Sequence, residues 1–267
     1  MPIRVIVAGG KGKMGSETIK MIADDPDLQL VSAVDSTLNN VDVGEVFGMG
    51  PMGVLFYNDL ERVLEQTEAD VLVDFTTPQH VKRHADLAIK YRVRPVIGTT
   101  GLTSEEISEI EQLCHRQQMG AILAPNFALG AVLMMKFARE AAKYMPDVEI
   151  IEMHHDRKLD APSGTALKTA EMIAEVRKEH KQGHPDEKET LDGARGAFYE
   201  GFPIHSVRLP GLVAHQQVIF GSEGQTLTIR HDSINRRSFM PGVRLAIRKV
   251  MELSKFVYGL DRVLENE

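Results

Sequence analysis

Residues 149–166 combine several side chains that can transfer protons or bind anions; they read EIIEMHHDRKLDAPSGTA. An apolar run typical of a buried strand ends in His154 and His155, and Lys158 follows. Imidazole and lysine side chains are common proton donors in active sites. Successive strand residues point to opposite faces, so we expect the two histidines to have different tasks. The stretch offers no cysteine and no HExxH pattern, so we predict no metal site.

The second half of this stretch opens a predicted helix with Ser163, Gly164 and Thr165. Hydroxyls and unpaired N–H groups at a helix N-terminus bind anions, and a glycine lets a ligand approach the backbone. Helix capping alone would explain Ser163, but not a lysine just upstream. We therefore predict that Lys158 and this helix start bind a carboxylate. Arg236 is a candidate for a second carboxylate, with a solvated surface arginine as the equal alternative.

A glycine-rich turn lies near the N-terminus, where the chain reads IRVIVAGGKGKMGSETIKMI. It contains the pattern GxGxxG at Gly10, Gly12 and Gly15, between a predicted strand and a predicted helix. In that context the glycines allow a tight turn, a close approach to a pyrophosphate and close helix–strand packing. The turn therefore predicts a dinucleotide site, with a ligand-free glycine turn as the alternative.

Asp35 ends the next predicted strand, where a carboxylate would bind the ribose hydroxyls of the dinucleotide. The alternative is a polar residue at a strand end with no ligand. A carboxylate favours NAD because it repels the additional phosphate of NADP. Lys11 and Lys13 in the glycine turn would offset that repulsion, so the preference between the two cofactors stays open.

The elements that must position these residues follow from the apolar pattern. In the first half, short Val- and Ile-rich runs alternate with helical patterns, which predicts an α/β fold with a doubly wound parallel sheet. The expected strands are 3–9, 28–35, 69–76, 94–100 and 120–125, and the expected helices are 14–25, 78–91 and 104–118. Residues 36–53 read as a long loop.

After residue 126 the pattern changes and predicts a second, α+β domain with a mostly antiparallel or mixed sheet. The expected helices are 129–145 and 165–179, and the expected strands are 147–155, 202–209, 212–220 and 225–232. The polar stretch 180–196 reads as a mobile or functional excursion. A last helix, 241–258, carries an apolar stripe that would pack on the first domain. We thus expect one domain at 1–126, completed by 236–267, and another at 127–235.

Composition restricts the class of protein. The chain has 267 residues with 43% hydrophobic and 26% charged residues, as in ordinary globular proteins. Its net charge of −7 argues against nucleic acid as a partner. The single cysteine, Cys114, lies in register with apolar helix positions, so we expect it to be buried, in a reducing compartment. No segment is long enough for a membrane span. We expect a cytoplasmic protein without a membrane partner.

With both motifs in view, the chain resembles the 4-hydroxy-tetrahydrodipicolinate reductase (dihydrodipicolinate reductase) family over essentially its whole length. The stretches that carry the resemblance are VAGGKGKMG, DFTTP, GTTG, APNFALG and HHDRKLDAPSGT. The resemblance implies a Rossmann-type domain followed by a substrate domain, and a homotetramer assembled through the second domain's sheet. It implies hydride transfer from NADH or NADPH to a cyclic dicarboxylate in diaminopimelate and lysine biosynthesis.

The resemblance also implies roles for individual residues. His154 would be the acid/base histidine, His155 a substrate-binding histidine and Lys158 the proton donor, while Gly164 and Thr165 would hold a substrate carboxylate. The implied cofactor residues are Gly9, Gly10, Lys11, Gly12, Lys13, Met14 and Asp35, with Gly98, Thr99, Thr100, Ala124, Pro125, Asn126 and Phe127 along the nicotinamide. Some family members have an arginine where this chain has Ser36, which argues against a strong NADP preference.

Two other functions are compatible with parts of the sequence. One is a Rossmann reductase acting on another amino-acid intermediate, such as a semialdehyde, which would not need two carboxylate-binding groups. The other is a non-catalytic dinucleotide sensor, which would need the glycine turn but not the histidines and Lys158.

Overall fold

A computed structural model describes residues 1–178 and 182–265. The chain divides into two compact units, Met1–Phe127 with Phe239–Glu267, and Ala128–Ser238. We expected the second domain at 127–235, so both boundaries fall slightly later. Phe127 belongs to the first unit because its ring packs edge to face on Phe75, with centroids 5.8 Å apart. Ser238 belongs to the second because its hydroxyl lies 2.7 Å from that of Ser233.

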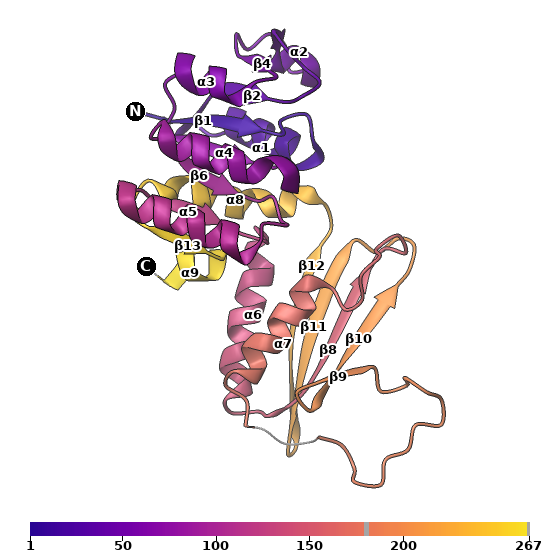
Figure 1. Cartoon of the computed structure of the whole chain (residues 1–267). Coiled ribbons are helices and arrows are strands. Elements are labelled where there is room, and N and C mark those ends of the chain that lie inside the picture. Colours follow the sequence, from indigo (N-terminus) through magenta and orange to yellow (C-terminus); the bar gives the residue numbers. More distant parts are fainter. Residues whose placement is uncertain (179–181, 266–267) are drawn as a thin grey trace. The chain divides into compact units, whose positions relative to one another are not determined.

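The first unit is built on an eight-stranded sheet with the order β13-β7-β6-β5-β1-β2-β4-β3 (Figure 1). The strands are β1 Ile3–Ala8, β2 Leu28–Val34, β3 Val41–Asp42, β4 Leu55–Tyr57, β5 Val71–Asp74, β6 Arg94–Ile97, β7 Ala121–Leu123 and β13 Phe256–Tyr258. Neighbouring strands are parallel except β3 and β4. The predicted doubly wound sheet is confirmed.

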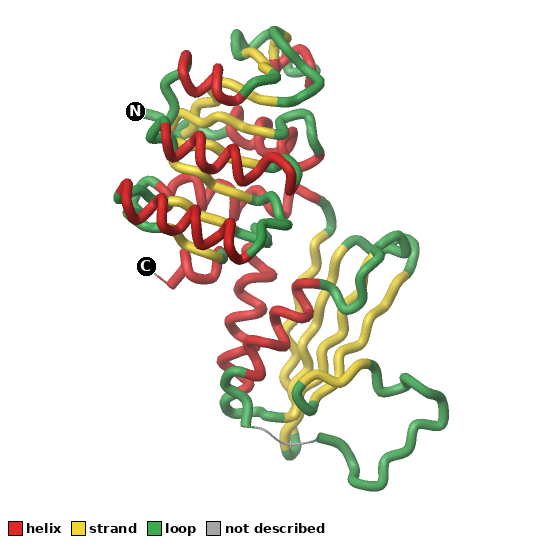
Figure 2. The backbone as a smooth tube through the Cα atoms, viewed as in Figure 1, coloured by secondary structure: helices red, strands yellow, loops and turns green. Residues whose placement is uncertain are grey.

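Helices cover both faces of this sheet (Figures 1 and 2). They are α1 Lys13–Ala23, α2 Val43–Phe47, α3 Leu60–Gln66, α4 Pro78–Lys90, α5 Ser104–Gln117, α8 Met240–Val250 and α9 Leu260–Glu265. The helices α3, α4 and α5 lie on one face, whereas α1 and α8 pack together on the other. Cys114 of α5 is completely buried against Ile89 and Ile110, and this burial raises the pKa of its thiol to about 12. It is a packing residue, as expected.

Two expectations for the first unit were wrong. Residues 36–53 are not one loop, because they contain β3 and α2. The carboxylate of Asp42 organises this segment by accepting backbone N–H bonds from Gly44, Glu45, Met52 and Gly53. The last predicted helix also ends early, at Val250, and β13 follows as a parallel neighbour of β7.

The second unit is a five-stranded sheet in the order β12-β11-β8-β10-β9, with two helices on one face (Figure 1). The elements are α6 Leu129–Ala142, β8 Asp147–His154, α7 Gly164–Ala174, β9 Ala197–Tyr199, β10 Phe202–Arg208, β11 Ala214–Ser222, β12 Gln225–Ser233 and the one-turn helix Arg236–Phe239. Only β8 and β10 pair in parallel, so the predicted mixed sheet is confirmed. The strand β9 was not predicted.

Within β8, alternate residues point toward the helices. Val148, Ile150 and Glu152 are at most 1% exposed, which is the period-two pattern of a half-buried strand. Of the polar stretch 180–196, residues 180 and 181 lie outside the described residues, and 182–196 form turns and irregular loops. Arg195 links this stretch to the other face of β8 through an ion pair with Glu149 at 2.8 Å. No helix in the described part of the chain is long and apolar enough to span a membrane.

Candidate active site

The glycine turn connects β1 to α1 and is too crowded for other residues. Gly9 has a φ of +73°, and a Cβ there would lie 2.4 Å from the carbonyl oxygen of Phe75. A Cβ on Gly15 would lie 2.1 Å from the carbonyl oxygen of Gly9. The N-cap of α1 is Gly12, which has no side chain to occupy the first N–H groups of the helix. These features match a site for a dinucleotide pyrophosphate.

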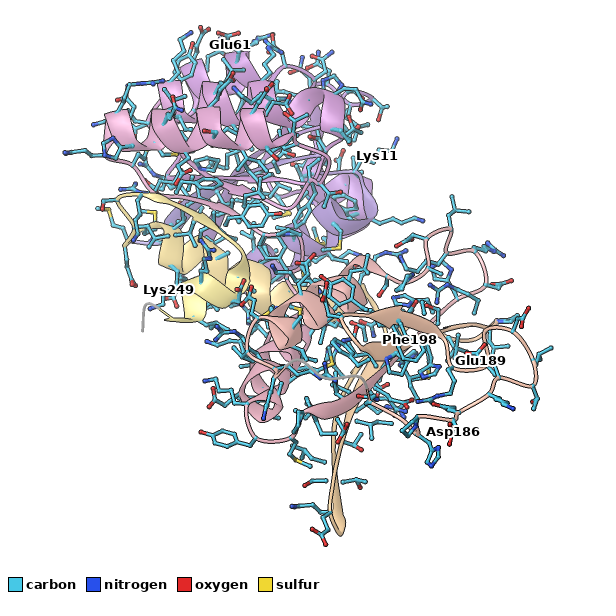
Figure 3. The ribbon with its side chains drawn as sticks, turned by 60° about the horizontal axis from the view of Figure 1, so that its bottom comes forward. Lys11, Glu61, Asp186, Glu189, Phe198 and Lys249 are labelled. Atoms are coloured by element: carbon cyan, nitrogen blue, oxygen red, sulfur yellow. The ribbon has the colours of Figure 1, made fainter. Side chains whose placement is uncertain are left out.

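Asp35 follows β2 and lies directly beside this turn. Its carboxylate accepts hydrogen bonds from the Lys11 backbone N–H at 3.1 Å and from the Thr37 hydroxyl at 2.8 Å. The Lys11 side chain extends outward at the surface (Figure 3). Lys13 is also exposed, whereas Met14 is half-buried. The structure thus brings the predicted ribose-binding carboxylate and both lysines to the glycine turn.

The remaining predicted cofactor residues follow the carboxyl ends of β6 and β7, at the same edge of the sheet as the glycine turn. A buried carboxylate, Asp74 at the end of β5, ties the loop after β5 to the loop after β6. It accepts the hydroxyls of Thr76 and Thr99, each at 2.7 Å, and lies 2.8 Å from Nδ1 of His84. Burial alone would raise the pKa of Asp74, but the bonds from His84, Thr99 and Thr76 lower it. Sequence reasoning missed this residue.

Close packing shapes the rest of this edge. A Cβ on Gly98 would lie 2.1 Å from the Phe75 ring, so only glycine fits there. Phe127 and Ala124 are 3% and 1% exposed, so their side chains are packing residues at this edge. The other predicted residues are more accessible: Thr100 and Pro125 are exposed and Asn126 is half-buried.

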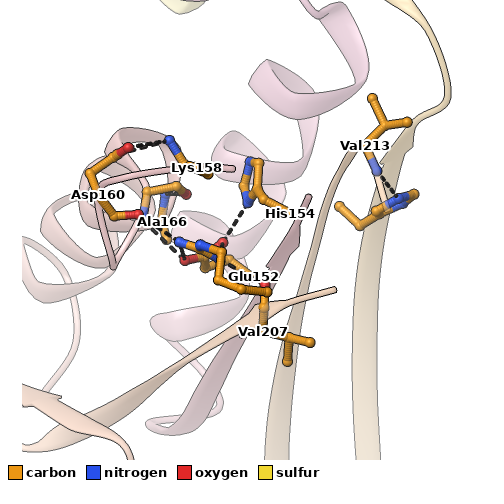
Figure 4. A network of polar contacts seen from close by, with 10 residues as sticks. Glu152, His154, Lys158, Asp160, Ala166, Val207 and Val213 are labelled. Atoms are coloured by element: carbon orange, nitrogen blue, oxygen red, sulfur yellow. Dashed lines mark hydrogen bonds and ion pairs between the residues drawn. The ribbon is translucent and has the colours of Figure 1, made fainter. Parts of the chain in front are cut away.

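In the second unit, His154 is the last residue of β8, and its Nδ1 lies 2.5 Å from Oε2 of Glu152 (Figure 4). Residues two apart on a strand share a face, which explains this pairing. His155 lies beyond the strand and is exposed. The predicted strand 147–155 therefore ends one residue early, and strand alternation does not determine the direction of His155.

Glu152 is the centre of a polar cluster. Besides His154, its carboxylate accepts two hydrogen bonds from the guanidinium of Arg208, at 2.6 and 2.9 Å, and one from the Ser163 N–H at 3.2 Å. Its side chain is fully buried. Burial alone would raise its pKa, but the bonds from His154, Arg208 and Ser206 lower the pKa of Glu152 to about 2. Glu152 is thus a carboxylate at neutral pH.

Lys158 lies beside this cluster and pairs with Asp160, its Nζ donating at 2.6 and 2.8 Å to the two carboxylate oxygens (Figure 4). This hydrogen bond lowers the pKa of Asp160. Arg208 donates to the Asp160 carbonyl at 2.7 Å, so the loop after β8 is tied to the same guanidinium as Glu152. His154 and Lys158 are therefore each held by a carboxylate, and Arg208 binds both carboxylate residues. Sequence reasoning did not identify Glu152 or Arg208 as part of this site.

The start of α7 gives different environments to the three residues predicted there. Ser163 is the N-cap, and its hydroxyl accepts the Ala166 N–H at 3.2 Å. Since its side chain is used in this way and the residue is only 3% exposed, the capping alternative describes it well. Gly164 is exposed with open space around its α-carbon, and Thr165 is half-buried. Arg236 lies exposed in the one-turn helix.

Comparisons with known proteins agree with this geometry. Two family models, "Dihydrodipicolinate reductase, N-terminus" and "Dihydrodipicolinate reductase, C-terminus", match residues 3–127 and 130–264. The chain is 60% identical over 263 residues to a 4-hydroxy-tetrahydrodipicolinate reductase of Halalkalibacterium halodurans, covering 98% of this chain and 100% of the relative. It is 58% identical over 265 residues to that of Geobacillus thermodenitrificans, covering 99% and 100%.

Solved structures give the same picture. The dipicolinate-bound dihydrodipicolinate reductase from Paenisporosarcina sp. TG-14 matches with a TM-score of 0.89 and 54% identity, over 98% of this chain and 99% of that one. An amine dehydrogenase from Mycobacterium smegmatis, at 16% identity and a TM-score of 0.70, covers 98% and 96% and shares the fold alone. Since the family models span nearly all of both units, the chain belongs to the dihydrodipicolinate reductase family.

Proposed function

We propose that this chain reduces 4-hydroxy-tetrahydrodipicolinate, through its dehydrated form, to tetrahydrodipicolinate with release of water, in diaminopimelate and lysine biosynthesis. The observation that carries the proposal is the cluster in the second unit. His154 and Lys158 are held by carboxylates beside the start of α7, within a chain that also bears a glycine turn and Asp35.

The first unit supplies the cofactor site. The N–H groups at the start of α1 suit the pyrophosphate, Asp35 the ribose, and the edge from Gly98 to Thr100 and from Ala124 to Phe127 the nicotinamide. When bound, a reduced nicotinamide supplies the hydride. We propose that NADH and NADPH both serve, because Asp35 favours NADH while Lys11 and Lys13 offset the repulsion of the phosphate. Ser36 offers no cation for that phosphate.

The second unit supplies the substrate site. The helix start at the exposed Gly164 and the half-buried Thr165 would hold one substrate carboxylate, and Arg236 the other. Hydride addition to a conjugated imine leaves an electron pair that must take up a proton. His154 and Lys158 would supply that proton and balance the negative charge. His155 would bind the substrate ring.

We further propose a homotetramer assembled through the sheet face that α6 and α7 leave open, and a cytoplasmic location. The open face carries half-exposed residues of β8, β10 and β11, which a partner subunit would cover. Light scattering tests the assembly: a mass of four chains is expected, and a monomer would contradict it.

The enzymatic proposal is tested by following oxidation of NADH and NADPH spectrophotometrically with freshly generated substrate. We expect His154→Ala and Lys158→Ala each to lower kcat by about 10²- to 10⁴-fold, the usual size of a general-acid contribution, with cofactor affinity near that of the wild type. Lys168→Ala is a matched control, because Lys168 lies exposed on α7 and pairs only with Glu171 in the described contacts. Near-normal turnover in the Lys158 variant would remove this residue from the chemistry.

A further inference from the structure

We propose that Glu152 is the positioning residue of the substrate site. It holds the His154 ring in the tautomer that carries its proton on Nδ1, and it fixes the start of α7 through Ser163. Nε2 is then the nitrogen of His154 that exchanges a proton with the substrate. This inference rests on the proposed function for its catalytic consequence, but its structural part stands independently.

The tautomer follows from the hydrogen-bonding capacity of the groups. An ionised carboxylate only accepts hydrogen bonds, so a ring nitrogen 2.5 Å from Glu152 Oε2 must carry a hydrogen. That nitrogen is Nδ1, whether the imidazole is neutral or protonated. In the neutral ring Nε2 has a free lone pair, and in the protonated ring it has a hydrogen to donate. A histidine that acts as a general acid or base must present the same ring nitrogen to the substrate in every turnover, and the bond to Glu152 makes that nitrogen Nε2.

The same carboxylate also connects the two halves of the substrate site. Its Oε1 accepts the N–H of Ser163, the residue that caps α7, while its Oε2 accepts from His154. Arg208 donates to both oxygens and neutralises the charge, which makes a fully buried carboxylate tolerable. One buried group thus sets both the direction of the imidazole and the position of the helix start that would bind a carboxylate.

Glutamine at position 152 would break this arrangement without changing its shape. A carboxamide has one acceptor oxygen and one donor NH₂ group, whereas the native carboxylate faces donors only. Arg208 and the Ser163 N–H cannot become acceptors. The His154 ring can do so by moving its proton to Nε2, and of the other groups bonded to Glu152 only the Ser206 hydroxyl can also accept. We therefore expect Glu152→Gln to convert neutral His154 to the other tautomer.

The chain offers a matched control on the same strand. Glu149 lies on the opposite face of β8 and likewise binds a histidine and an arginine, with His205 Nε2 at 2.9 Å and Arg195 at 2.8 Å. Glu149→Gln therefore removes a similar charge from a similar His–carboxylate–Arg cluster. It does so away from His154 and Ser163, so it controls for the loss of a paired charge on β8.

The experiment compares the wild type with Glu152→Gln and Glu149→Gln in the full-length chain. Solid-state ¹⁵N NMR of histidine-labelled protein reports the tautomer, with the His154 signal identified by its loss in His154→Gln. For Glu152→Gln we expect the Nε2–H tautomer, weaker binding of dipicolinate by calorimetry and a kcat lowered by about 10- to 100-fold. The KM for the reduced nicotinamide should stay within about twofold of the wild type in Glu152→Gln, and Glu149→Gln should keep the Nδ1–H tautomer of His154.

The outcomes separate the two proposals. Retention of the Nδ1–H tautomer in Glu152→Gln, or a kcat within about twofold of the wild type, would overturn the role of Glu152. A wild-type chain that does not turn over the dicarboxylate would overturn the proposed function, while the tautomer measurement still tests the structural part. If Glu152→Gln does not fold, Glu152→Asp decides, because it keeps the charge but withdraws it from the ring. An unchanged kcat in that variant would contradict the proposal.

Discussion

We propose that the charge of Asp35 sets the balance between the two nicotinamide cofactors. In the structure this carboxylate lies against the Lys11 backbone and Thr37, where a ribose would approach. It would accept hydrogen bonds from the ribose of NADH and repel the additional phosphate of NADPH. We therefore expect Asp35→Ala to raise the KM for NADH more than that for NADPH, each measured with saturating substrate.

Asp59→Asn serves as the control for this prediction. Asp59 also follows a strand of the sheet, but its carboxylate caps α3 by accepting the Glu61 N–H at 3.0 Å. This variant should change neither KM. Equal weakening of both cofactors by Asp35→Ala would show that the carboxylate shapes the turn and does not read the ribose.

A residue of the site can be identified from the sequence when its partners lie close to it along the chain. His154 and Lys158 were recognisable because their types and order are unusual within one short stretch. Glu152 could have been found, since it lies two positions before His154 on a strand and so shares its face. Arg208 reaches the cluster from β10, 56 positions further along the chain, and no local pattern indicates that contact.

At the scale of elements, the start of α7 places a capping residue next to residues that we propose bind the substrate. The Ser163 hydroxyl caps the helix, whereas the exposed Gly164 leaves the backbone open to a ligand. We expect Ser163→Ala to lower the free energy of unfolding by about 1 kcal/mol, the usual value of an N-cap, in urea denaturation.

We expect Gly164→Ala to leave the free energy of unfolding unchanged or slightly higher. We expect it to raise the KM for the substrate, because a methyl group would obstruct the substrate carboxylate.

The two variants act as controls for each other. If Gly164→Ala destabilised the protein as much as Ser163→Ala and left the KM unchanged, the start of α7 would be a structural cap and not an anion site. A stability unaffected by Ser163→Ala would contradict the capping role that the hydrogen bond to Ala166 indicates.

Helices and strands were predictable from the sequence where they are long enough to show a pattern of apolar residues. The strands β1, β2, β5, β6 and β7 are mostly apolar and mostly buried, and the helices between them have a clear apolar stripe. The unpredicted strands β3, β4, β9 and β13 have two or three residues each, too few to show a period, and depend on pairing with a neighbour. For that reason Phe256–Tyr258 was assigned to the preceding helix, although it extends the sheet beside β7.

At the scale of the whole molecule, the first unit is assembled from two distant parts of the chain. The C-terminal segment returns after the second unit, and Val243, Ile247 and Val250 of α8 are completely buried in the first. The apolar stripe of α8 made this return predictable. The ion pairs that hold α8 to the first unit could not be predicted, because they join the loop after α1 to two arginines more than two hundred positions later.

This attachment is made by Asp25, whose side chain is 4% exposed. It forms ion pairs with Arg244 at 2.8 Å and Arg248 at 3.1 Å, while the neighbouring Asp27 is 71% exposed and pairs with Arg248 alone in the described contacts. Both arginines are partly solvated, so removing the carboxylate leaves charges that water can reach, and the cost is moderate.

We expect Asp25→Asn to lower the free energy of unfolding by about 2 kcal/mol, as for buried hydrogen bonds to charged groups, and to lower the midpoint in scanning calorimetry. Asp27→Asn should change the free energy by less than about 0.5 kcal/mol, because an exposed ion pair contributes little. The loss in Asp25→Asn should diminish little with added salt, since a partly buried pair is screened less than an exposed one. If both variants behaved alike, or if salt abolished the difference, the C-terminal segment would be held to the first unit by the apolar packing of α8 alone.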